Sequence, residues 1–274
     1  MTDSFTFSET RIVARQPKKP RVTLLGTGNA FNTDGRLSQA LFVEPHRGSP
    51  FLVDVGPTAL AGMANCHVSP EPIDRVFITH LHGDHIAGWP FLVIDFLYVQ
   101  KRQRPLHVYG PSGTRETLTK LIDICYGELF TPDRASFTVH YHELDVEERR
   151  TIEVDHDVGD GLTVDTLPMD HHPTSIGYCF HFSSKHRLGV SGDTCWCSGL
   201  QKLAASSTVL VTECTMVEKE APGHLSVAEL VARRVELDAP SVVVVHLCDA
   251  VAAALSRARL EGVIVGEDGM TVAL

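Results

Sequence analysis

The chain has 274 residues, enough for one large α/β domain or two small ones with a full hydrophobic core. Its hydrophobic content of 43% and charged content of 21% exclude a disordered or fibrous protein. A formal net charge of −10 argues against a surface that neutralises many nucleic-acid phosphates, because nonspecific affinity for nucleic acid comes mainly from Lys and Arg.

In chain order, residues 1–20 are predicted to be an N-terminal lead-in, followed by a single domain over 21–274. Short runs of apolar and β-branched residues, bounded by turn residues, predict strands throughout this domain. The predicted strands cover residues 22–25, 40–43, 51–54, 75–79, 162–164, 176–180, 188–190, 208–211, 241–245, 263–265 and 270–272.

Helices are predicted between these strands, over residues 86–100, 112–122 and 226–237. The first contains Pro90, which weakens its pattern. The last begins with Ser226 and Glu229 in a capping-box arrangement, and Pro240 stops it. With no linker and no solenoid repeat, the pattern predicts an α/β domain in which two sheets pack face to face with helices outside.

Seven cysteines in no regular framework indicate free thiols and a reducing compartment. The N-terminus shows no basic segment followed by an apolar core, so no signal peptide is expected. The longest apolar stretches are too short to span a bilayer. We therefore expect a cytoplasmic protein without a membrane segment.

The densest chemical motif lies just after the predicted strand 75–79. His80, His82, Asp84 and His85 fall within six positions. Alternate residues of an extended segment point the same way, so His80 and His82 can reach one metal ion, while Asp84 and His85, past the flexible Gly83, can face a second. The ordinary alternative is a surface loop whose histidines titrate freely. That explanation suits a single exposed His far better than it suits three His and one Asp within six positions.

Further candidate ligands follow predicted strands in the second half of the chain. His171 and His172 precede the strand 176–180, Asp193 follows the strand 188–190, and His246 follows the strand 241–245. Side chains at strand ends can meet at one rim of a sandwich. A carboxylate such as Asp193 can bridge two cations, which an imidazole cannot.

The order His-x-His-x-Asp-His, a lone His, an Asp in Gly-Asp-Thr and a late His resembles the metallo-β-lactamase superfamily, over roughly residues 25–246. Shorter matches, including Asp54-Val55-Gly56 and Gly223-His224-Leu225-Ser226, resemble its ribonuclease Z and cyclic phosphodiesterase branch. This resemblance implies an αββα four-layer sandwich. It also implies that His80, His82 and His171 hold one metal, that Asp84, His85 and His246 hold the other, and that Asp193 bridges the two.

His171 is preferred to His172 as a ligand, because the branch places a histidine four residues before a serine, here Ser175. The resemblance implies two divalent cations, with Zn²⁺ as the default and Mn²⁺ or Fe²⁺ as alternatives. Such a pair, about 3.5–4 Å apart, lowers the pKa of a shared water, so that a hydroxide attacks the substrate. Asp84 takes part in this catalysis as well as in metal binding.

Three more residues have candidate roles beside the metals. His224 is the expected proton donor to a leaving alkoxide, with simple loop packing as the alternative. Asp54 is expected to orient a metal-bound histidine. Glu213 is expected either to act near His224 or to make a surface hydrogen bond. Cys195 and Cys197 are expected to pack rather than to form a redox or metal pair.

The favoured activity is hydrolysis of a small phosphodiester, such as a cyclic nucleotide. Ribonuclease Z proteins that mature tRNA insert a long arm before the bridging Asp, whereas barely a strand and a turn separate His171 from Asp193. Transfer RNA processing and nucleic-acid binding are therefore disfavoured. Other electrophiles, namely a lactone, thioester, sulfate ester or aryl halide, remain alternatives, and so does a metal-binding module without turnover.

The substrate pocket is expected to be formed by residues 29–36, residues 89–98 and Trp196. Because related proteins are often dimers, a homodimer is a further expectation from the resemblance.

Overall fold

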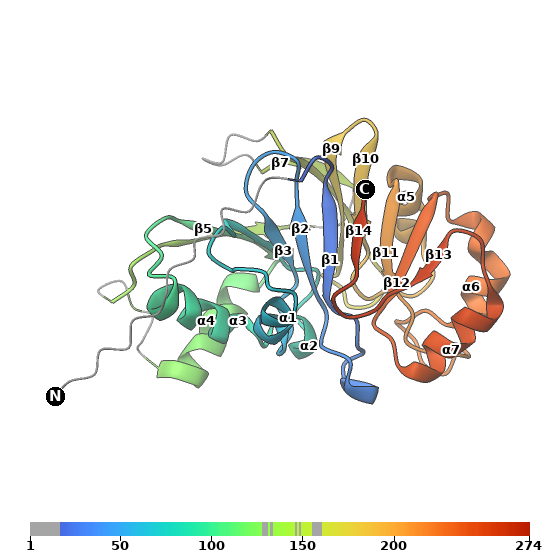
Figure 1. Ribbon diagram of the computed structural model, residues 1–274, viewed down its shortest axis with the longest axis horizontal. Coiled ribbons are helices and arrows are strands. Elements are labelled where there is room, and N and C mark those ends of the chain that lie inside the picture. The colour runs from blue at the N-terminus through green and yellow to red at the C-terminus, as the bar shows by residue number, and fades with distance from the viewer. Residues whose placement is uncertain (1–16, 128–130, 132–133, 146, 148, 155–160) are drawn as a thin grey trace.

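The computed structural model describes residues 17–127, 131, 134–145, 147, 149–154 and 161–274. The greater part of the predicted lead-in, residues 1–16, lies outside the described residues. Two sheets form the centre of the molecule, and helices cover their outer faces (Figure 1). The predicted αββα sandwich is therefore confirmed.

Each sheet draws its strands mainly from one half of the sequence. Sheet 1 has the order β14-β1-β2-β3-β4-β5-β6, and sheet 2 has the order β13-β12-β11-β10-β9-β8-β7. Sheet 1 contains β1 (Arg21–Gly26), β2 (Ala40–Glu44), β3 (Phe51–Val53), β4 (Arg75–Phe77), β5 (Leu106–Pro111), β6 (Val139–Leu144) and β14 (Thr271–Ala273). Sheet 2 contains β7 (Arg150–Glu153), β8 (Thr163–Pro168), β9 (Ile176–Ser183), β10 (His186–Val190), β11 (Val209–Glu213), β12 (Ser241–Val245) and β13 (Val263–Val265).

The strands that lead into the candidate site run in the same direction within each sheet. Strands β3 to β6 are parallel, and so are β10 to β13. Strand β8 shares the direction of β10, because both are antiparallel to β9. The carboxyl ends of parallel strands meet at one edge of a sheet, where ligands bind in open α/β sheets.

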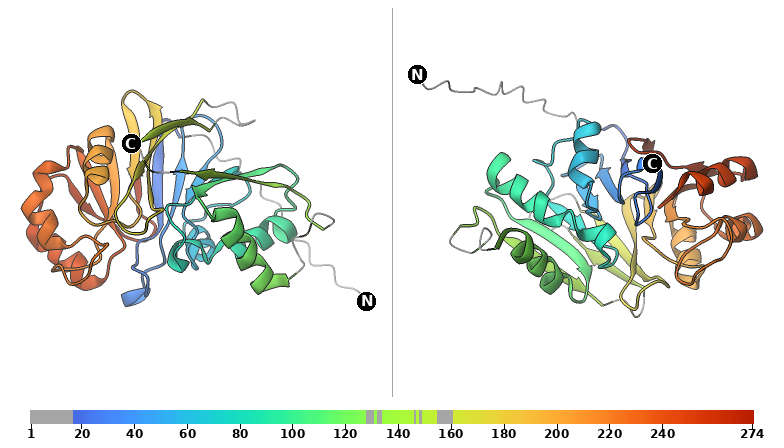
Figure 2. Two further views of the ribbon diagram at one scale, coloured as in Figure 1. Left: turned by 180° about the vertical axis from the view of Figure 1, so that it is seen from behind. Right: turned by 90° about the horizontal axis from the view of Figure 1, so that it is seen from below.

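Helices flank the two sheets on opposite outer sides (Figure 2). Beside sheet 1 lie α1 (Ala59–Asn65), α2 (Gly83–Ile86), α3 (Trp89–Ile94), the π-helix η2 (Asp95–Val99) and α4 (Thr114–Tyr126). Beside sheet 2 lie α5 (Ser198–Ser206), α6 (Val227–Arg233), the short helix η4 (Arg234–Glu236) and α7 (Asp249–Ala258). A short 3₁₀ turn, η1 (Thr33–Gly35), lies in the loop between β1 and β2.

Three apolar clusters hold these layers together. One lies between the sheets and includes Phe51, Phe77 and Phe180, whose rings pack with centroids 4.8 to 5.2 Å apart. The other two lie under the helices on the outer face of each sheet. Strands buried on both faces read as continuous apolar runs, which explains why sequence patterning located most of them.

The predicted helix 86–100 is wrong as a single element. The chain forms α2, then a break at Gly88, then α3, in which Pro90 occupies the first turn. Proline is well accommodated there because the first helical N–H groups need no intrahelical partner. Pro90 therefore begins a helix rather than interrupting one, and the segment ends in the π-helical turn η2.

The predicted helix 226–237 begins as expected, with a capping box between Ser226 and Glu229. It is regular only to Arg233 and continues as the 3₁₀ turn η4. Among the described residues, none of the helices has the length and apolar character that a bilayer span needs. All seven cysteines are free thiols.

Candidate dinuclear metal centre

The predicted ligands converge from both sheets at the carboxyl ends of their strands. His80, His82, Asp84 and His85 follow β4 in sheet 1. From sheet 2, His171 follows β8, Asp193 follows β10 and His246 follows β12. The described residues contain four groups of possible ligand atoms, with all atoms of a group within 4.8 Å of one another, and two of these groups consist only of predicted ligands: His80, His82 and His171 in one, and Asp84, His85, Asp193 and His246 in the other.

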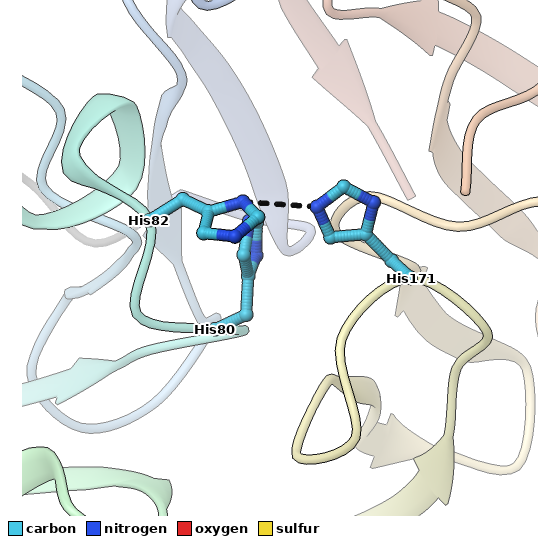
Figure 3. A group of neighbouring side chains, drawn as sticks. All are labelled: His80, His82 and His171. Carbon is cyan, nitrogen blue, oxygen red and sulfur yellow. Dashed lines mark hydrogen bonds between the residues drawn. The ribbon is translucent and has the colours of Figure 1, made fainter. Parts of the chain in front are cut away.

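The first group is made of three imidazoles. His171 Nε2 lies 3.0 Å from His82 Nδ1, and the ring of His80 lies 4.7 Å from that of His82 and 4.9 Å from that of His171. Figure 3 shows the rings of His82 and His171 facing each other from opposite sides, with His80 below. His172 is not part of this group, because its Nδ1 faces Thr174 Oγ1 at 3.1 Å.

The second group combines two imidazoles with two carboxylates. His246 Nε2 lies 3.1 Å from Asp84 Oδ2, and His85 Nε2 lies 3.4 Å from the same oxygen. Asp193, a member of the second group, also faces the first: its Oδ1 is 3.3 Å from His85 Nε2, and its Oδ2 is 3.8 and 3.9 Å from Nε2 of His80 and His171. This is the position that a bridging carboxylate requires.

Four of the five imidazoles are held by their Nδ1 atoms so that Nε2 points into the centre. His85 Nδ1 donates to Asp54 Oδ2 at 2.8 Å, and His171 Nδ1 donates to the carbonyl oxygen of Gly223 at 2.8 Å. These acceptors fix the proton on Nδ1, which leaves a lone pair on Nε2 for a metal. Asp54, fully buried, is thus the residue that orients His85.

Hydroxyl groups orient the other two imidazoles in the same way. Thr79 Oγ1 donates to Asp54, and Thr215 Oγ1 donates to Glu213 at 2.8 Å, so each hydroxyl oxygen accepts from a histidine. His80 Nδ1 lies 3.1 Å from Thr79 Oγ1, and His246 Nδ1 lies 2.8 Å from Thr215 Oγ1.

Neighbouring charges at the centre shift the pKa values of its buried groups. Burial alone would raise the pKa of Asp193, but His246 and His85 lower it well below its ordinary value. Burial alone would lower the pKa of His85, but Asp193 and Asp54 raise it well above its ordinary value. The carboxylates therefore attract positive charge to this point.

The geometry and chemistry of the donor atoms fit two divalent cations. Nε2 of His80 and Nε2 of His85 are buried, and neither makes a hydrogen bond of good geometry with the part of the chain that the structure describes. Ligand atoms about 2.1 Å from a tetrahedral Zn²⁺ ion lie roughly 3.4 Å apart, which matches the separations of 3.0 to 3.9 Å found here. Each orphaned nitrogen would gain a partner in a bound cation.

The backbone is strained where it delivers these ligands. Asp54 and His246 have φ values of 61° and 58°, in the left-handed region that non-glycine residues rarely adopt. Gly192, with φ of 59°, precedes Asp193. A Cβ on Gly192 would lie 2.6 Å from Cβ of Thr79, so the close approach of the two sheets at the site depends on glycine here.

We therefore expect Gly192→Ala to destabilise the metal-free protein by roughly 3 kcal/mol, through left-handed strain and overpacking against Thr79. Urea unfolding measures this change. Gly35→Ala is the matched control, because Gly35 also has positive φ but no neighbour within 4 Å of its Cβ position. Equal destabilisation by the two variants would show that packing against Thr79 contributes nothing.

A second charged pair stands beside the ligands. Nδ1 of His224 donates to Glu213 Oε1 at 2.7 Å, and Glu213 is buried rather than at the surface. The ring of His224 lies 4.6 Å from that of His171 and 5.7 Å from that of His246. Burial lowers the pKa of His224, but the hydrogen bond and the charge of Glu213 outweigh it and raise the pKa above its ordinary value.

Several residues expected at the pocket are used for packing instead. Within the predicted wall 89–98, the side chains of Trp89, Leu92, Val93 and Phe96 are buried in the helix-side core of sheet 1. Trp196 packs under the guanidinium group of Arg233, whose Cζ atom lies 4.2 Å from the centre of the Trp196 ring.

The cysteine pair has structural contacts. Cys195 Sγ donates to Asp170 Oδ2 at 2.9 Å, and burial together with this carboxylate raises the pKa of its thiol to about 12. Cys197 Sγ accepts from the backbone N–H of Leu200 and caps α5. A thiol with so high a pKa is a poor nucleophile and metal ligand.

Sequence reasoning missed Thr79 and Thr215 as residues of the site. Thr79 precedes the ligand His80, and Thr215 lies two residues after Glu213. Because Thr is common at strand ends, nothing in the sequence distinguishes these two residues from ordinary strand residues. The left-handed backbone at Asp54 and His246 was equally hidden, because neither residue is a glycine.

The family model described as anti-Pycsar protein Apyc1 matches residues 20–259. The chain belongs to this Apyc1 family. Curated relatives of the Apyc1-family chain include a ribonuclease Z from Mycobacterium sp. (strain KMS), 34% identical over 199 residues, which cover 69% of this chain and 67% of that protein. A ribonuclease Z from Thermococcus kodakarensis is 33% identical over 61% of this chain and 48% of its own length.

Solved structures share the fold of the Apyc1-family chain. The metallo-β-lactamase fold protein YhfI from Bacillus subtilis aligns with a TM-score of 0.72 at 18% identity, covering 93% of this chain and 99% of that chain. Human tRNase Z, short form, aligns with a TM-score of 0.70 at 24% identity, covering 92% and 98%. The predicted resemblance to ribonuclease Z-like members of the metallo-β-lactamase superfamily is confirmed, and the likenesses support a metal-dependent hydrolase.

Proposed function

We propose that the chain is a phosphodiesterase that hydrolyses a small substrate such as a cyclic nucleotide, with two Zn²⁺ ions as its cofactors. The observation that carries this proposal is the pairing of two ligand groups around Asp193 with a raised-pKa histidine, His224, beside them. Phosphodiester hydrolysis needs an activated water, stabilisation of charge on two oxygens and a proton for the leaving alkoxide.

The residues of the chain divide these tasks. When bound, divalent cations would supply a nucleophilic water at neutral pH and stabilise negative charge on the phosphate. Asp193, which faces both ligand groups, would help to hold both cations, and Asp84 would help to hold one of them while adding negative charge to the centre. His224, kept protonated by Glu213, gives its proton to the leaving oxygen.

A small substrate is favoured by the segment between His171 and Asp193. It contains the hairpin of β9 and β10 and a short turn, with no room for an arm that grips a large nucleic acid. The net charge of −10 also disfavours a polyanionic substrate. The free cysteines favour a reducing compartment, so we place the enzyme in the cytoplasm.

Transfer RNA 3′ processing is the second candidate, because curated relatives are named ribonuclease Z. The two activities are separated by a panel of substrates: 3′,5′-cyclic nucleotides, bis(p-nitrophenyl) phosphate, a precursor tRNA, a lactone and a thioester. Metal analysis of the purified chain accompanies the assays.

We expect cyclic nucleotides to be converted to nucleoside monophosphates, loss of this activity in chelator, and its recovery with Zn²⁺. Cleavage of precursor tRNA with no turnover of cyclic nucleotides would replace the proposal with the second candidate. Turnover of the lactone or thioester alone would show that the site serves another electrophile, and bound metal without any turnover would indicate a binding module.

A further inference from the structure

Phe31 is the most exposed aromatic side chain among the described residues. It is 85% exposed, compared with 58% for Tyr98 and 47% for Phe91. It lies in the loop 29–36 between β1 and β2, which contains the turn η1. In Figure 1 this turn projects from the end of the sandwich at which α2 lies. Single exposed apolar side chains are common on protein surfaces, so the place of Phe31 relative to the candidate site, rather than its exposure alone, decides whether it has a use.

Hydrogen bonds on both sides of Phe31 hold the loop in one conformation. Asn29 Oδ1 accepts from the backbone N–H of Phe31 at 3.2 Å and from Thr33 Oγ1 at 3.0 Å. Asn32 Nδ2 donates to Ser38 Oγ at 2.9 Å and to the carbonyl oxygen of Arg36, also at 2.9 Å. The ring is therefore displayed by an ordered turn with side-chain anchors immediately before and after it.

Both ends of the loop that carries Phe31 lie against segments of the second group of ligands. The backbone N–H of Asn29 donates to the carbonyl oxygen of Leu247, the residue after His246, at 3.1 Å. On the other side, a Cβ built on Gly56 would lie 2.7 Å from Ser38 Cβ and 2.4 Å from the carbonyl oxygen of Asp84, so Ser38 and Asp84 are close neighbours. The loop that carries Phe31 thus borders the two segments that carry His246 and Asp84.

The loop offers a ring to the substrate rather than a charge. Its one cationic side chain, Arg36, is engaged inward: Nη1 donates to Thr27 Oγ1 at 2.9 Å and to the carbonyl oxygen of Gly266 at 3.0 Å. Asp34, on the same turn, carries a negative charge and accepts from the backbone N–H of Asp249. A phosphate would find no free cation here, whereas a flat, uncharged group could lie on the exposed face of Phe31.

We propose that Phe31 is a stacking platform for the nucleobase of the substrate while the phosphate lies at the ligand groups. This inference rests on the proposed phosphodiesterase function. Stacking on an aromatic ring is available to every base, so Phe31 would strengthen binding of nucleotides as a class without choosing strongly among bases. Phe31 is then a binding residue and takes no part in the bond-breaking step.

The test compares Phe31→Ala with the wild type on two substrates, a 3′,5′-cyclic nucleotide and the 3′,5′-cyclic phosphate of methyl riboside, which has the same ester but no aromatic group. We expect KM for the cyclic nucleotide to rise by about tenfold or more, from loss of one stacking contact, with kcat nearly unchanged. Kinetics on the base-free ester should not change. Ile124→Ala, a truncation of another exposed apolar side chain on α4, is the control and should match the wild type on both substrates.

A direct readout uses Phe31→Trp, whose indole fluorescence should be quenched when the cyclic nucleotide binds and unchanged when inorganic phosphate is added. An unaltered KM for the cyclic nucleotide in Phe31→Ala would overturn the inference, as would equal losses on both substrates. A change in oligomeric state at unaltered KM would instead assign Phe31 to contact with a second copy. If the wild type turned over no cyclic nucleotide, the proposed function itself would fail, which is a separate outcome.

Discussion

Asp193→Ala is expected to lower the turnover of a phosphodiester by more than about a thousandfold, since loss of a single stabilising group at a developing charge already costs roughly a hundredfold to a thousandfold. Asp193 faces Nε2 of His80, His85, His171 and His246 within 3.3 to 3.9 Å. Its removal deprives both metal positions of a shared ligand. The measurements are the initial rate with saturating Zn²⁺ and the metal content after dialysis.

The expected metal content falls below that of the wild type, and excess Zn²⁺ does not restore the rate. Asp123→Ala, a carboxylate on the exposed side of α4, is the control and should retain both properties. Thermal unfolding of the metal-free proteins checks that Asp193→Ala still folds. A folded variant with a rate near that of the wild type would refute the bridging role.

His224→Ala is expected to produce the second large effect, and its size should depend on the leaving group. For a cyclic nucleotide, whose leaving alkoxide needs a proton, the rate should fall by roughly a hundredfold or more. For bis(p-nitrophenyl) phosphate, whose leaving group is stable as an anion, the fall should be less than about fivefold. Equal losses on the two substrates would contradict a proton-donor role. His172→Ala is the control, because His172 is an exposed neighbour that faces Thr174.

The pH profile gives an independent test of the same residue. The donor must be protonated, and Glu213 raises the pKa of His224 above its ordinary value despite burial. Cyclic nucleotide turnover should therefore decline only as the pH rises through this raised pKa. In Glu213→Gln the negative charge is lost, so the pKa of His224 falls and the alkaline decline moves to lower pH. An unmoved alkaline limb would exclude the pairing as the source of the protonated state.

Much of the candidate site could be predicted because its residues are of rare types at strand ends. His80, His82, Asp84 and His85 form a dense motif, and Asp193 and His246 each follow an apolar run. The choice of His171 over His172 came from a family pattern, and the structure brings His171, not His172, against His82. The roles of Thr79 and Thr215 could not be predicted, because each depends on hydrogen bonds between the hydroxyl group, a carboxylate and a histidine. Only the tertiary structure brings these groups together.

The fold was less fully predicted where local signals were weak. Strands β6 and β7 lie at the sheet edges and alternate exposed charged or histidine residues with partly buried ones, so their patterns lack continuous apolar runs. Strand β5 is buried, but His107, Tyr109 and Gly110 interrupt its apolar run. The helix α1 is short and consists mainly of Ala and other small residues, which carry little periodic signal. Pro90 weakens the sequence pattern of a single long helix, because the pattern does not reveal the break at Gly88 that places Pro90 in the first turn of α3.

The pairing of β14 with β1 has a consequence for how the protein is made. Thr271, Val272 and Ala273 form the edge of sheet 1 against Thr23, Val22 and Arg21, so the first and last strands of the domain meet. During translation, β1 leaves the ribosome long before β14 is synthesised. The backbone groups on the β14 side of β1 therefore stay unpaired until nearly the whole chain has been made. Asp268, which accepts from Thr27 and Leu37 at both ends of the Phe31 loop, arrives equally late. The rim of the site is therefore completed only after translation of the final strand.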